Sequence, residues 1–561
     1  DTLPGEINEL YEASASSEEA AKKTKAAIAK KQEALDKARA ELAQFNQEQF
    51  NQLTESQKRL YNQAFVVNSG DPNYRNLSKL SYDDNGTKRE LQVPAGDLFY
   101  QFRKDVNEGK LPTVSWLAAP QNFSDHPSAP WYGAWYVSEI MDILTKNPEV
   151  WKKTIFIVTY DENDGYFDHV QPFYIPDGKR PETGKCSNGI DTEIEWVRLE
   201  NELAQGIPEK QAREAPIGLG FRVPMIIASP WSRGGKVCSQ LFDHTSTQQF
   251  LEVFFKKKLG KDIRQTNISE WRRTICGDLT AAFSPFEGKQ PGTLPFLKRD
   301  AIVEDIYNAK FKPEPNGYKQ LSEQDIHRII EQPGALDEWL RQEKGIRRSS
   351  ALPYELYADA ALSADKKHIA IRMTAGNKVF GRQSAGSPFT VYAPGQYTEK
   401  GATDICRNWG FAVKAGDTLS YTWPLEAFDN GQYHLRLYGP NGFFREFKGQ
   451  ASNLEPEARV EYELNARTRK PTGNLLLHLV NPAQNAVQVT IRDNAYKKKD
   501  IVKQVTKGGK LALKLSLKDS HGWYDFSVTV QGAAGFEKRY AGRVETGKEG
   551  FSDPYMGRMI G

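Results

Sequence analysis

The residues best suited to chemistry stand in one segment, TIFIVTYDENDGYFDHV, residues 154–170. A short run of β-branched and aromatic residues ends at a cluster of polar side chains: Asp161, Glu162, Asn163 and Asp164, followed by Asp168 and His169. The run predicts a buried strand of a parallel sheet, and ligands in open α/β sheets bind just beyond the carboxyl ends of such strands. Carboxylates gathered there repel one another unless a cation or solvent neutralises them. This segment alone leaves a metal site and a solvated acidic turn equally open.

Aspartate-histidine doublets recur in the same part of the chain. Of the eight histidines, three directly follow an aspartate near a predicted strand end: His126, His169 and His244. One such doublet is usually a surface accident, but three on loops at one edge of a sheet suit the hydrolysis of a phosphate or sulfate ester. A divalent cation held by carboxylates polarises the ester and lowers the pKa of the attacking group. Histidines stabilise the oxyanion or protonate the leaving group near neutral pH.

The elements around these residues alternate between strands and helices. Three apolar runs predict buried strands and two amphipathic stretches predict helices: 111–120, 154–160 and 223–230, then 131–147 and 246–260. Strands that alternate with helices favour a parallel α/β sheet. Residues 171–222, rich in Gly, Pro and charges, predict a long excursion over the active face.

The two ends of the chain differ from this α/β part. Residues 16–48 lack Gly and Pro and predict a long helix with one thin apolar stripe, which packs on the protein body or pairs with another helix. After residue 350 the pattern becomes all-β, and Tyr354-Glu355-Leu356 is echoed by Tyr462-Glu463-Leu464. This internal repeat predicts two small β-sandwiches. We therefore expect a helical segment, an α/β domain and two β-sandwich domains: residues 1–50, 51–345, 350–450 and 455–561.

The composition excludes several classes of function. The chain has 75 Lys and Arg against 72 Asp and Glu, so no nucleic acid or other general polyanion is expected as a partner. No stretch approaches 18 consecutive apolar residues, so no transmembrane helix is expected. The four cysteines lie far apart without zinc-type spacing, and they are either free thiols or paired in one or two disulfides.

Taken together, these segments resemble a known enzyme family. The chain is similar to the bacterial phosphoesterase family, which contains phosphatidylcholine-hydrolysing phospholipases C and acid phosphatase A-type enzymes, in VSWLAAPQNFSDHPSAP, GAWYVSEIMDILTKNPEVWKKTIFIVTYDENDGYFDHV, VPMIIASPWSRGGKVCSQLFDHTSTQQFLE and ISEWRRTICGDLTAAFSP. The duplicated β-unit and the tail, GWYDFSV with GFEKRYAGRVETGKEGFSDPYMG, resemble the phospholipase C branch. The resemblance covers residues 100–290 and 350–560.

The resemblance implies a fold and a set of site residues. It implies an alkaline-phosphatase-like α/β core that uses one or more divalent metals of unspecified identity. Asp161 and Glu162 would be metal ligands, and His126 would lie in the active site. His169 and His244 would lie at or near the site.

The family pattern also includes a part that we do not find. A Glu-Asn metal-binding motif and a Ser or Thr nucleophile are expected upstream of these segments, and we find neither in residues 1–110. The chain therefore resembles the C-terminal two-thirds of a longer enzyme, beginning in a helical insertion. We expect such a chain to be inactive alone, or to associate with the missing segment supplied as a separate chain.

The expected function is that of a metal-dependent phospholipase C, which releases diacylglycerol and phosphocholine from phosphatidylcholine. The expected partners are a phospholipid or phosphorylcholine ester and, peripherally, a membrane surface, for a secreted or periplasmic protein. Two alternatives remain: an acid phosphatase or sulfatase-like esterase of the same superfamily, and a non-catalytic binding or surface protein with an incomplete active site.

Overall fold

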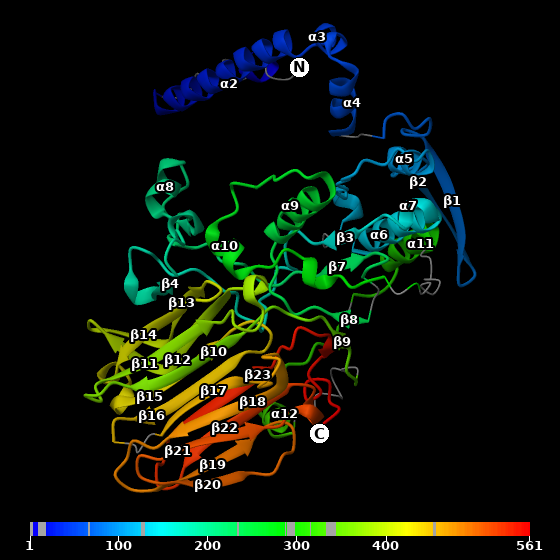
Figure 1. Ribbon diagram of the computed structural model, residues 1–561. Helices are drawn as coiled ribbons and strands as arrows, with labels where there is room; N and C mark the ends of the chain where they lie inside the picture. Colours follow the sequence, from blue (N-terminus) through cyan, green and yellow to red (C-terminus); the bar gives the residue numbers. More distant parts are fainter. Residues whose placement is uncertain are drawn as a thin grey trace. The chain divides into compact units, whose positions relative to one another are not determined.

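The computed structural model describes residues 4–8, 18–64, 68–124, 130–232, 235–286, 288, 298–314, 316–332, 344–452 and 456–560 (Figure 1). The chain divides into two compact units: Asp1–Val150 with Pro295–Glu314, and Trp151–Leu294 with Pro315–Gly561. The Asp161 segment and the whole β-rich region belong to the second unit.

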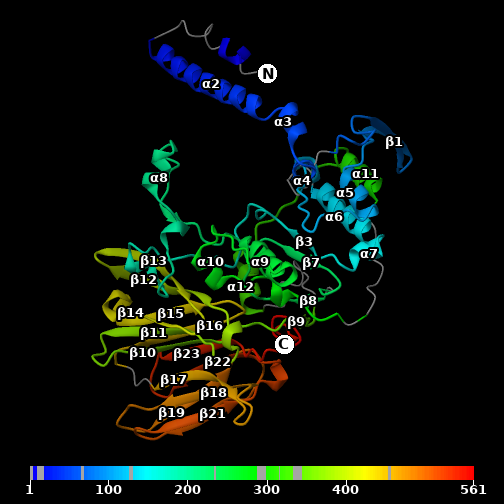
Figure 2. The same cartoon turned by 45° about the horizontal axis from the view of Figure 1, so that its top comes forward.

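The first unit begins with the predicted long helix. α2 (Glu18–Gln44) is followed by α3 (Gln47–Gln52), which Asn46 caps, and by α4 (Glu55–Ala64) (Figure 2). Long helices without Gly or Pro form readily from Ala, Lys, Glu and Gln, which have high helix propensity. Leu42 of the apolar stripe is exposed, so the stripe is not buried at this end of α2.

A hairpin and three packed helices complete the first unit. β1 (Leu77–Asp84) and β2 (Thr87–Pro94) pair antiparallel around Asn85-Gly86, whose positive φ angles suit a two-residue hairpin turn. The helices α5, α6 and α11 pack together: Tyr100–Asn107, Pro130–Thr145 and Arg299–Ala309. Their apolar side chains bury a small core that contains Phe99, Val106, Trp135, Tyr136, Ile140 and Ile143.

The second unit contains the strand that precedes the acidic cluster. β3 (Phe156–Thr159) and β7 (Met225–Ala228) form a two-stranded sheet, so both strands lie where they are predicted. They run antiparallel, however, with Thr159 opposite Met225. The prediction of a parallel sheet is therefore wrong for the described residues, and residues 111–120 form no strand.

The physical reason for this difference lies in burial. β3 and β7 have four residues each and are mostly half-buried, so they do not need the cover on both faces that a parallel sheet requires. Residues 113–120 are exposed, and the segment contains Pro112 and Pro120, which cannot donate to a strand ladder. An apolar run marks a strand but not the direction of its neighbour.

Two helices of the second unit carry residues close to the candidate site. The predicted helix 246–260 is α9 (Thr245–Leu259), which ends at Gly260 in the left-handed conformation. α10 (Glu270–Ile275) begins at Ser269, whose side chain accepts a hydrogen bond from the Arg272 backbone. Residues of α10 pack in a small hydrophobic core with residues from other segments: Ile175, Ile190, Trp196, Trp271, Ile275, Cys276 and Ala412.

Several shorter elements lie outside the helices and sheets described so far. They are α7 (Pro148–Trp151), β4 (Gly184–Cys186), β5 (Trp196–Val197), α8 (Leu199–Ala204), β6 (Ala215–Pro216), β8 (Lys236–Val237), α12 (Glu323–Glu331), β9 (Arg348–Ser349) and β24 (Gly550–Phe551). β4 pairs parallel with a strand of the β-rich region, β13, and so ties the excursion after β3 to that region.

The β-rich region contains the predicted repeat. Its first seven strands are β10 (Leu356–Leu362), β11 (His368–Ala375), β12 (Ser387–Glu399), β13 (Ala402–Val413), β14 (Thr418–Pro424), β15 (Gln432–Tyr438) and β16 (Phe444–Gln450). Its next seven are β17 (Glu457–Leu464), β18 (Pro471–Val480), β19 (Val487–Asp493), β20 (Ile501–Val505), β21 (Lys510–Leu515), β22 (Trp523–Val530) and β23 (Glu537–Arg543). The first, second and fifth strand of each set form a three-stranded sheet, β10-β11-β14 and β17-β18-β21.

The remaining strands of both repeats join in one sheet, which the prediction of two separate sandwiches did not include. Across the described residues its order is β20-β19-β22-β23-β16-β15-β12-β13-β4. The antiparallel pairing of β16 with β23 connects the repeats, with Phe447 opposite Lys538. One hydrophobic cluster contains buried residues of both repeats, so they share a core.

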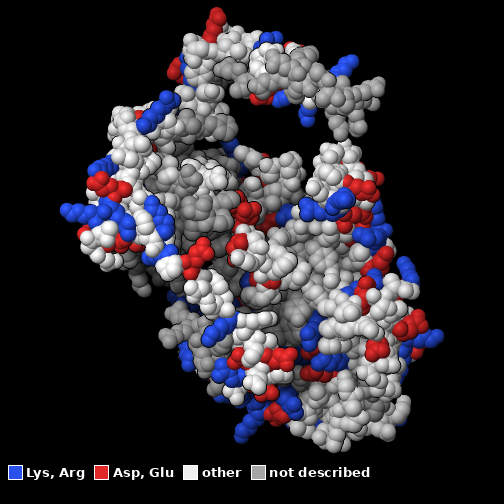
Figure 3. Space-filling model, turned by 180° about the vertical axis from the view of Figure 1, so that it is seen from behind, with Lys and Arg blue, Asp and Glu red and all other residues white. Residues whose placement is uncertain are grey.

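Three further predictions concern the whole chain. All four cysteines are free thiols, which settles the open question of disulfides. Among the described helices, none combines the length and apolarity needed to cross a bilayer. On the described part of the face shown in Figure 3, groups of Lys and Arg side chains are interspersed with groups of Asp and Glu.

Candidate functional site

The acidic cluster forms an exposed loop directly after β3. Asp161 and Glu162 both lie at the surface. Within the described part of the chain, no hydrogen bond or ion pair engages either carboxylate. Both groups are therefore available to a ligand or cation from solvent.

His244 meets this loop from another part of the sequence. The residue directly precedes α9, and its Nε2 lies 3.0 Å from the backbone oxygen of Asp161. A carbonyl oxygen only accepts, so Nε2 carries the proton in this contact and Nδ1 is left to exchange one. The structure thus brings together two of the predicted site residues, His244 and Asp161, which are 83 positions apart.

Asp243, the residue before His244, is held by Thr245 and Arg272. Asp243 Oδ1 accepts hydrogen bonds from the Thr245 backbone N at 3.0 Å and from Thr245 Oγ1 at 2.6 Å, which fixes the start of α9. Asp243 Oδ2 accepts from Arg272 Nη1 at 2.6 Å. The aspartate of this doublet is therefore engaged in structure rather than free for a metal.

Arg272 is the centre of a largely buried ion-pair network. Its Nε and Nη2 donate to the two oxygens of Glu195, each at 2.9 Å, and Ser269 Oγ donates to Glu195 at 2.5 Å. Burial alone would lower the pKa of Arg272, but the hydrogen bonds to Glu195 and Asp243 outweigh it, and the pKa is raised. The guanidinium stays charged and ties α10 to the segment before α9.

The second doublet of the region is organised by a different arginine. Arg222 Nε and Nη2 donate to the two oxygens of Asp168 at 2.6 and 3.0 Å. The hydrogen bond from Arg222 is the main cause that holds the pKa of Asp168 well below its usual range. His169 Nδ1 lies 3.2 Å from Asp168 Oδ1, and the ring is exposed. No hydrogen bond or ion pair among the described residues joins His169 to Asp161 or His244.

The structure leaves one predicted site residue undescribed and adds three residues that were not predicted. His126 lies outside the described residues. Sequence reasoning missed Arg222, Arg272 and Glu195, because an arginine or glutamate without a recurring motif gives no signal of a long-range ion pair. Arg272 lies in the segment ISEWRRTICGDLTAAFSP, which matched the family only as a whole, and Arg222 directly precedes the matching segment that begins at Val223.

The donors for a metal ion are incomplete in the described residues. Carboxylate oxygens suit a hard divalent cation, and Asp161 and Glu162 offer them at the surface. No group of three or more His, Cys, Asp or Glu side chains that could hold a metal occurs among the described residues. Two donors do not make a metal site.

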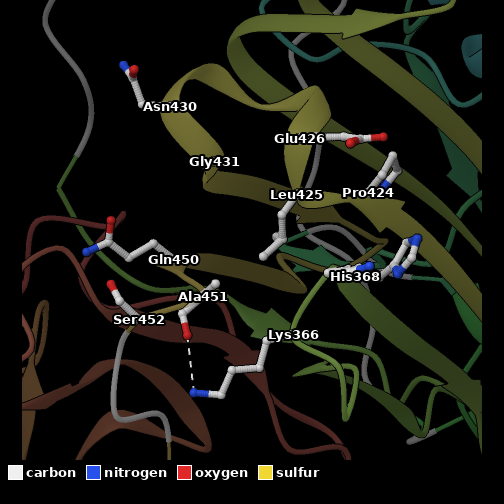
Figure 4. Close-up of a pocket in the computed structure, with 11 residues that line it drawn as sticks. Lys366, His368, Pro424, Leu425, Glu426, Asn430, Gly431, Gln450, Ala451 and Ser452 are labelled. Atoms are coloured by element: carbon white, nitrogen blue, oxygen red, sulfur yellow. Dashed lines mark hydrogen bonds between the residues drawn. The ribbon is translucent and has the colours of Figure 1, made fainter.

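A surface hollow of about 560 Å³ lies elsewhere, in the first β-repeat (Figure 4). Polar and charged groups from three strand ends line it, among them Lys366, His368, Glu426 and Gln450. Lys366 Nζ donates to the backbone oxygen of Ala451 at 3.2 Å. None of the predicted site residues lines this hollow.

Comparisons with known proteins cover both parts of the chain. The model of the phosphoesterase family matches residues 2–258. The model of the bacterial phospholipase C C-terminal domain matches twice, at residues 349–450 and 456–543, which agrees with the two repeats of strands.

Curated relatives match over most of the chain. The non-hemolytic phospholipase C of Burkholderia pseudomallei is 35% identical over 506 residues, which are 88% of this chain and 65% of the relative. The non-hemolytic and hemolytic phospholipases C of Pseudomonas aeruginosa are 36% and 35% identical, over 81% and 86% of this chain and 60% and 62% of their own lengths. The chain thus spans less than two thirds of the length of these relatives. With one family model over its α/β part and two domain matches over its β-rich part, the chain belongs to the phosphoesterase family, in the group that carries the bacterial phospholipase C C-terminal domain.

Proposed function

We propose that the chain acts in the hydrolysis of phosphatidylcholine by a phospholipase C mechanism, a phosphoric diester hydrolysis that releases diacylglycerol and phosphocholine. The observation that carries the proposal is the contact of His244 with the Asp161 loop, inside the segment that matches the phosphoesterase family. The two phospholipase C C-terminal domains and the names of the relatives support the diester over a monoester.

The roles follow from which groups are free. Asp161 and Glu162 would supply two donors to a divalent cation, and His126 lies outside the described residues. Such a cation would polarise the phosphate ester. His244 donates a hydrogen bond from its protonated Nε2 to the Asp161 backbone oxygen, so Nδ1 is the ring nitrogen that takes up or releases a proton. His169, which is exposed beside Asp168 in the same loop, is a further candidate for the acid or base.

The finer features of the fold and location belong to the same proposal. The core would be alkaline-phosphatase-like, and the domains would cover residues 51–345, 350–450 and 455–561 after the helical segment 1–50. The two β-domains would be lipid-interface or substrate-docking modules, and the protein would be secreted or periplasmic. The family membership and the domain matches support these assignments.

Hydrolysis of two chromogenic esters tests the reaction. We expect faster turnover of nitrophenyl-phosphocholine than of nitrophenyl phosphate, with Mg²⁺, Mn²⁺, Ca²⁺ or Zn²⁺ added. The chain is assayed alone and mixed with the segment of a longer relative that it does not match, and we expect turnover only in the mixture. A preference for the monoester would instead support the phosphatase alternative, and no turnover in either sample would contradict the proposal.

Metal content provides a second, independent test. We expect a stoichiometric divalent ion in the mixture and its loss in D161A and E162A, measured by elemental analysis after gel filtration. The matched control is E200A, which removes an exposed carboxylate of α8 away from the acidic loop. An equal metal content in all four proteins would contradict the assigned ligands.

One observation favours the non-catalytic alternative. Asp161 and Glu162 offer two free carboxylates in the acidic loop, and no group of three or more His, Cys, Asp or Glu side chains that could hold a metal occurs among the described residues. A binding protein with a partial site would take up no metal under any condition, alone or in the mixture. The same elemental analysis therefore separates the two functions.

A further inference from the structure

The loop after the acidic cluster exposes two large aromatic side chains. Tyr166 is 76% exposed and Phe167 is 92% exposed. A group of neighbouring exposed apolar side chains forgoes the free energy that burial would give, so such a group, unlike a single exposed side chain, marks a surface that a partner covers.

The loop is held in this conformation by hydrogen bonds. The Tyr166 backbone N donates to Asp164 Oδ1 at 3.1 Å, and Asn163 Nδ2 donates to the Tyr166 backbone oxygen at 2.7 Å. The two-pronged ion pair of Arg222 with Asp168 fixes the far end of the loop. The aromatic side chains are therefore presented by a fixed loop and not by a free end.

A second segment adds to this surface. Phe221 packs edge-on against Phe167, with ring centroids 5.5 Å apart and an angle of 88° between the rings. The β3–β7 register explains this contact, because Thr159 opposite Met225 places both segments at the same end of the strand pair. We call Tyr166, Phe167 and Phe221 the aromatic edge.

A cationic group stands within the aromatic edge. Arg222 directly follows Phe221, and its side chain is 60% exposed. Its Nε and Nη2 hold Asp168, while its Nη1 makes no hydrogen bond within the described part of the chain. Guanidinium donors of this kind bind phosphate oxygens.

We propose that the aromatic edge inserts into the surface of a phosphatidylcholine membrane while Arg222 Nη1 binds a lipid phosphate. Aromatic side chains favour the membrane interface, where their apolar rings contact the acyl chains and a polar group such as the Tyr hydroxyl contacts the headgroups and water. Asp161 and Glu162 lie on the same loop, so a lipid held there has its phosphate next to the candidate site. The proposal deepens the proposed function and rests on it.

Binding to large unilamellar vesicles of phosphatidylcholine tests the proposal without hydrolysis. The full chain is mixed with vesicles in the presence of a chelator, and the bound fraction is measured by sedimentation. Removal of one inserted aromatic side chain corresponds to about a tenfold loss of partitioning. We expect this loss for F167A and a comparable loss for Y166A, and retained binding with a blue-shifted emission for F167W.

Matched controls and competing outcomes decide the interpretation. Y318A removes an aromatic side chain that is 86% exposed outside the loop, and it leaves vesicle binding unchanged if the aromatic edge is specific. An excess of soluble phosphocholine displaces the chain only if headgroup contact alone holds it, which would overturn the insertion. Vesicle binding by F167A equal to that of the wild type would also overturn the proposal. So would a wild-type chain that does not bind vesicles and instead forms dimers, if F167A disrupts those dimers. Vesicle binding without ester hydrolysis would leave this inference standing and remove the proposed function.

Discussion

At the scale of single residues, the four thiols occupy contrasting surroundings. Cys406 is exposed, whereas burial raises the pKa of Cys186 to about 12 and that of Cys276 well above its ordinary value. Burial likewise raises the pKa of Cys238. The thiolate is the reactive form, so a raised pKa and limited access both slow modification.

This contrast predicts a simple titration. We expect one thiol, Cys406, to react rapidly with Ellman's reagent at pH 8, and C406S to abolish this fast phase. All four thiols should react in strong urea without a reductant. Fewer than four under denaturing conditions would reveal a disulfide and contradict the structure.

Arg272 offers a prediction about how much its buried ion pairs stabilise the fold. Replacement of this arginine by methionine leaves Glu195 and Asp243 buried without their partner, which typically costs about 3–5 kcal/mol of stability. We expect R272M to lower the urea midpoint of the second unit accordingly. R264M, which breaks the exposed pair of Arg264 with Glu270, should cost less than about 1 kcal/mol. Equal midpoints for the two variants would show that the Arg272 network does not stabilise the fold.

At the scale of elements, local patterns were predictable and long-range pairing was not. The helix around residues 246–260 and the strands around 154–160 and 223–230 follow from periodicity and composition, which act within a few residues. The antiparallel direction of β3 and β7 depends on whether other elements cover both faces of the strand pair, which the sequence of the strands does not show. The Arg272–Glu195 pair joins residues 77 positions apart, and no local signal connects them. The candidate site was therefore predictable as a set of loops, but its supporting arginines were not.

The strand pair β15–β16 carries a prediction about acid stability. Glu446 on β16 is buried, with its Oε1 2.7 Å from His434 Nε2 and 2.8 Å from Arg436 Nε on β15. The hydrogen bond with His434, together with Arg436, lowers the pKa of Glu446 to about 2. A carboxyl whose pKa is lower in the folded state stabilises the fold above its unfolded pKa of about 4.3, and this contribution is lost as the pH falls from there to 2.

The variant E446Q removes this titration. We expect it to be less stable than the wild type at pH 7 and to lose less stability between pH 4.5 and 2, because no carboxylate remains to be protonated. Urea unfolding midpoints at half-unit pH steps measure both effects. Parallel profiles for the two proteins would contradict the role of Glu446.

At the scale of the whole molecule, the β-rich region shows where sequence reasoning stops. Echoed triplets such as Tyr354-Glu355-Leu356 and Tyr462-Glu463-Leu464 predicted a duplication, and the strand order confirms it. The pairing of β16 with β23 was not predictable, because each strand alternates its side chains in the way any edge or central strand of a sandwich does. Only the register, with Phe447 opposite Lys538, shows that the repeats continue one sheet.

Because the repeats share a sheet and a core, we expect them to unfold as one unit. Phe447 is fully buried in the shared core, and a Phe to Ala change in a core typically costs about 3–5 kcal/mol. Because β16 is bonded to β23, we expect F447A to raise hydrogen exchange in β11 of the first repeat and in β18 of the second to the same degree. I405A removes an exposed side chain of β13 and should change neither. Faster exchange confined to the first repeat would mean that the duplicated domains unfold separately, each with its own core, and that the sheet only places them side by side.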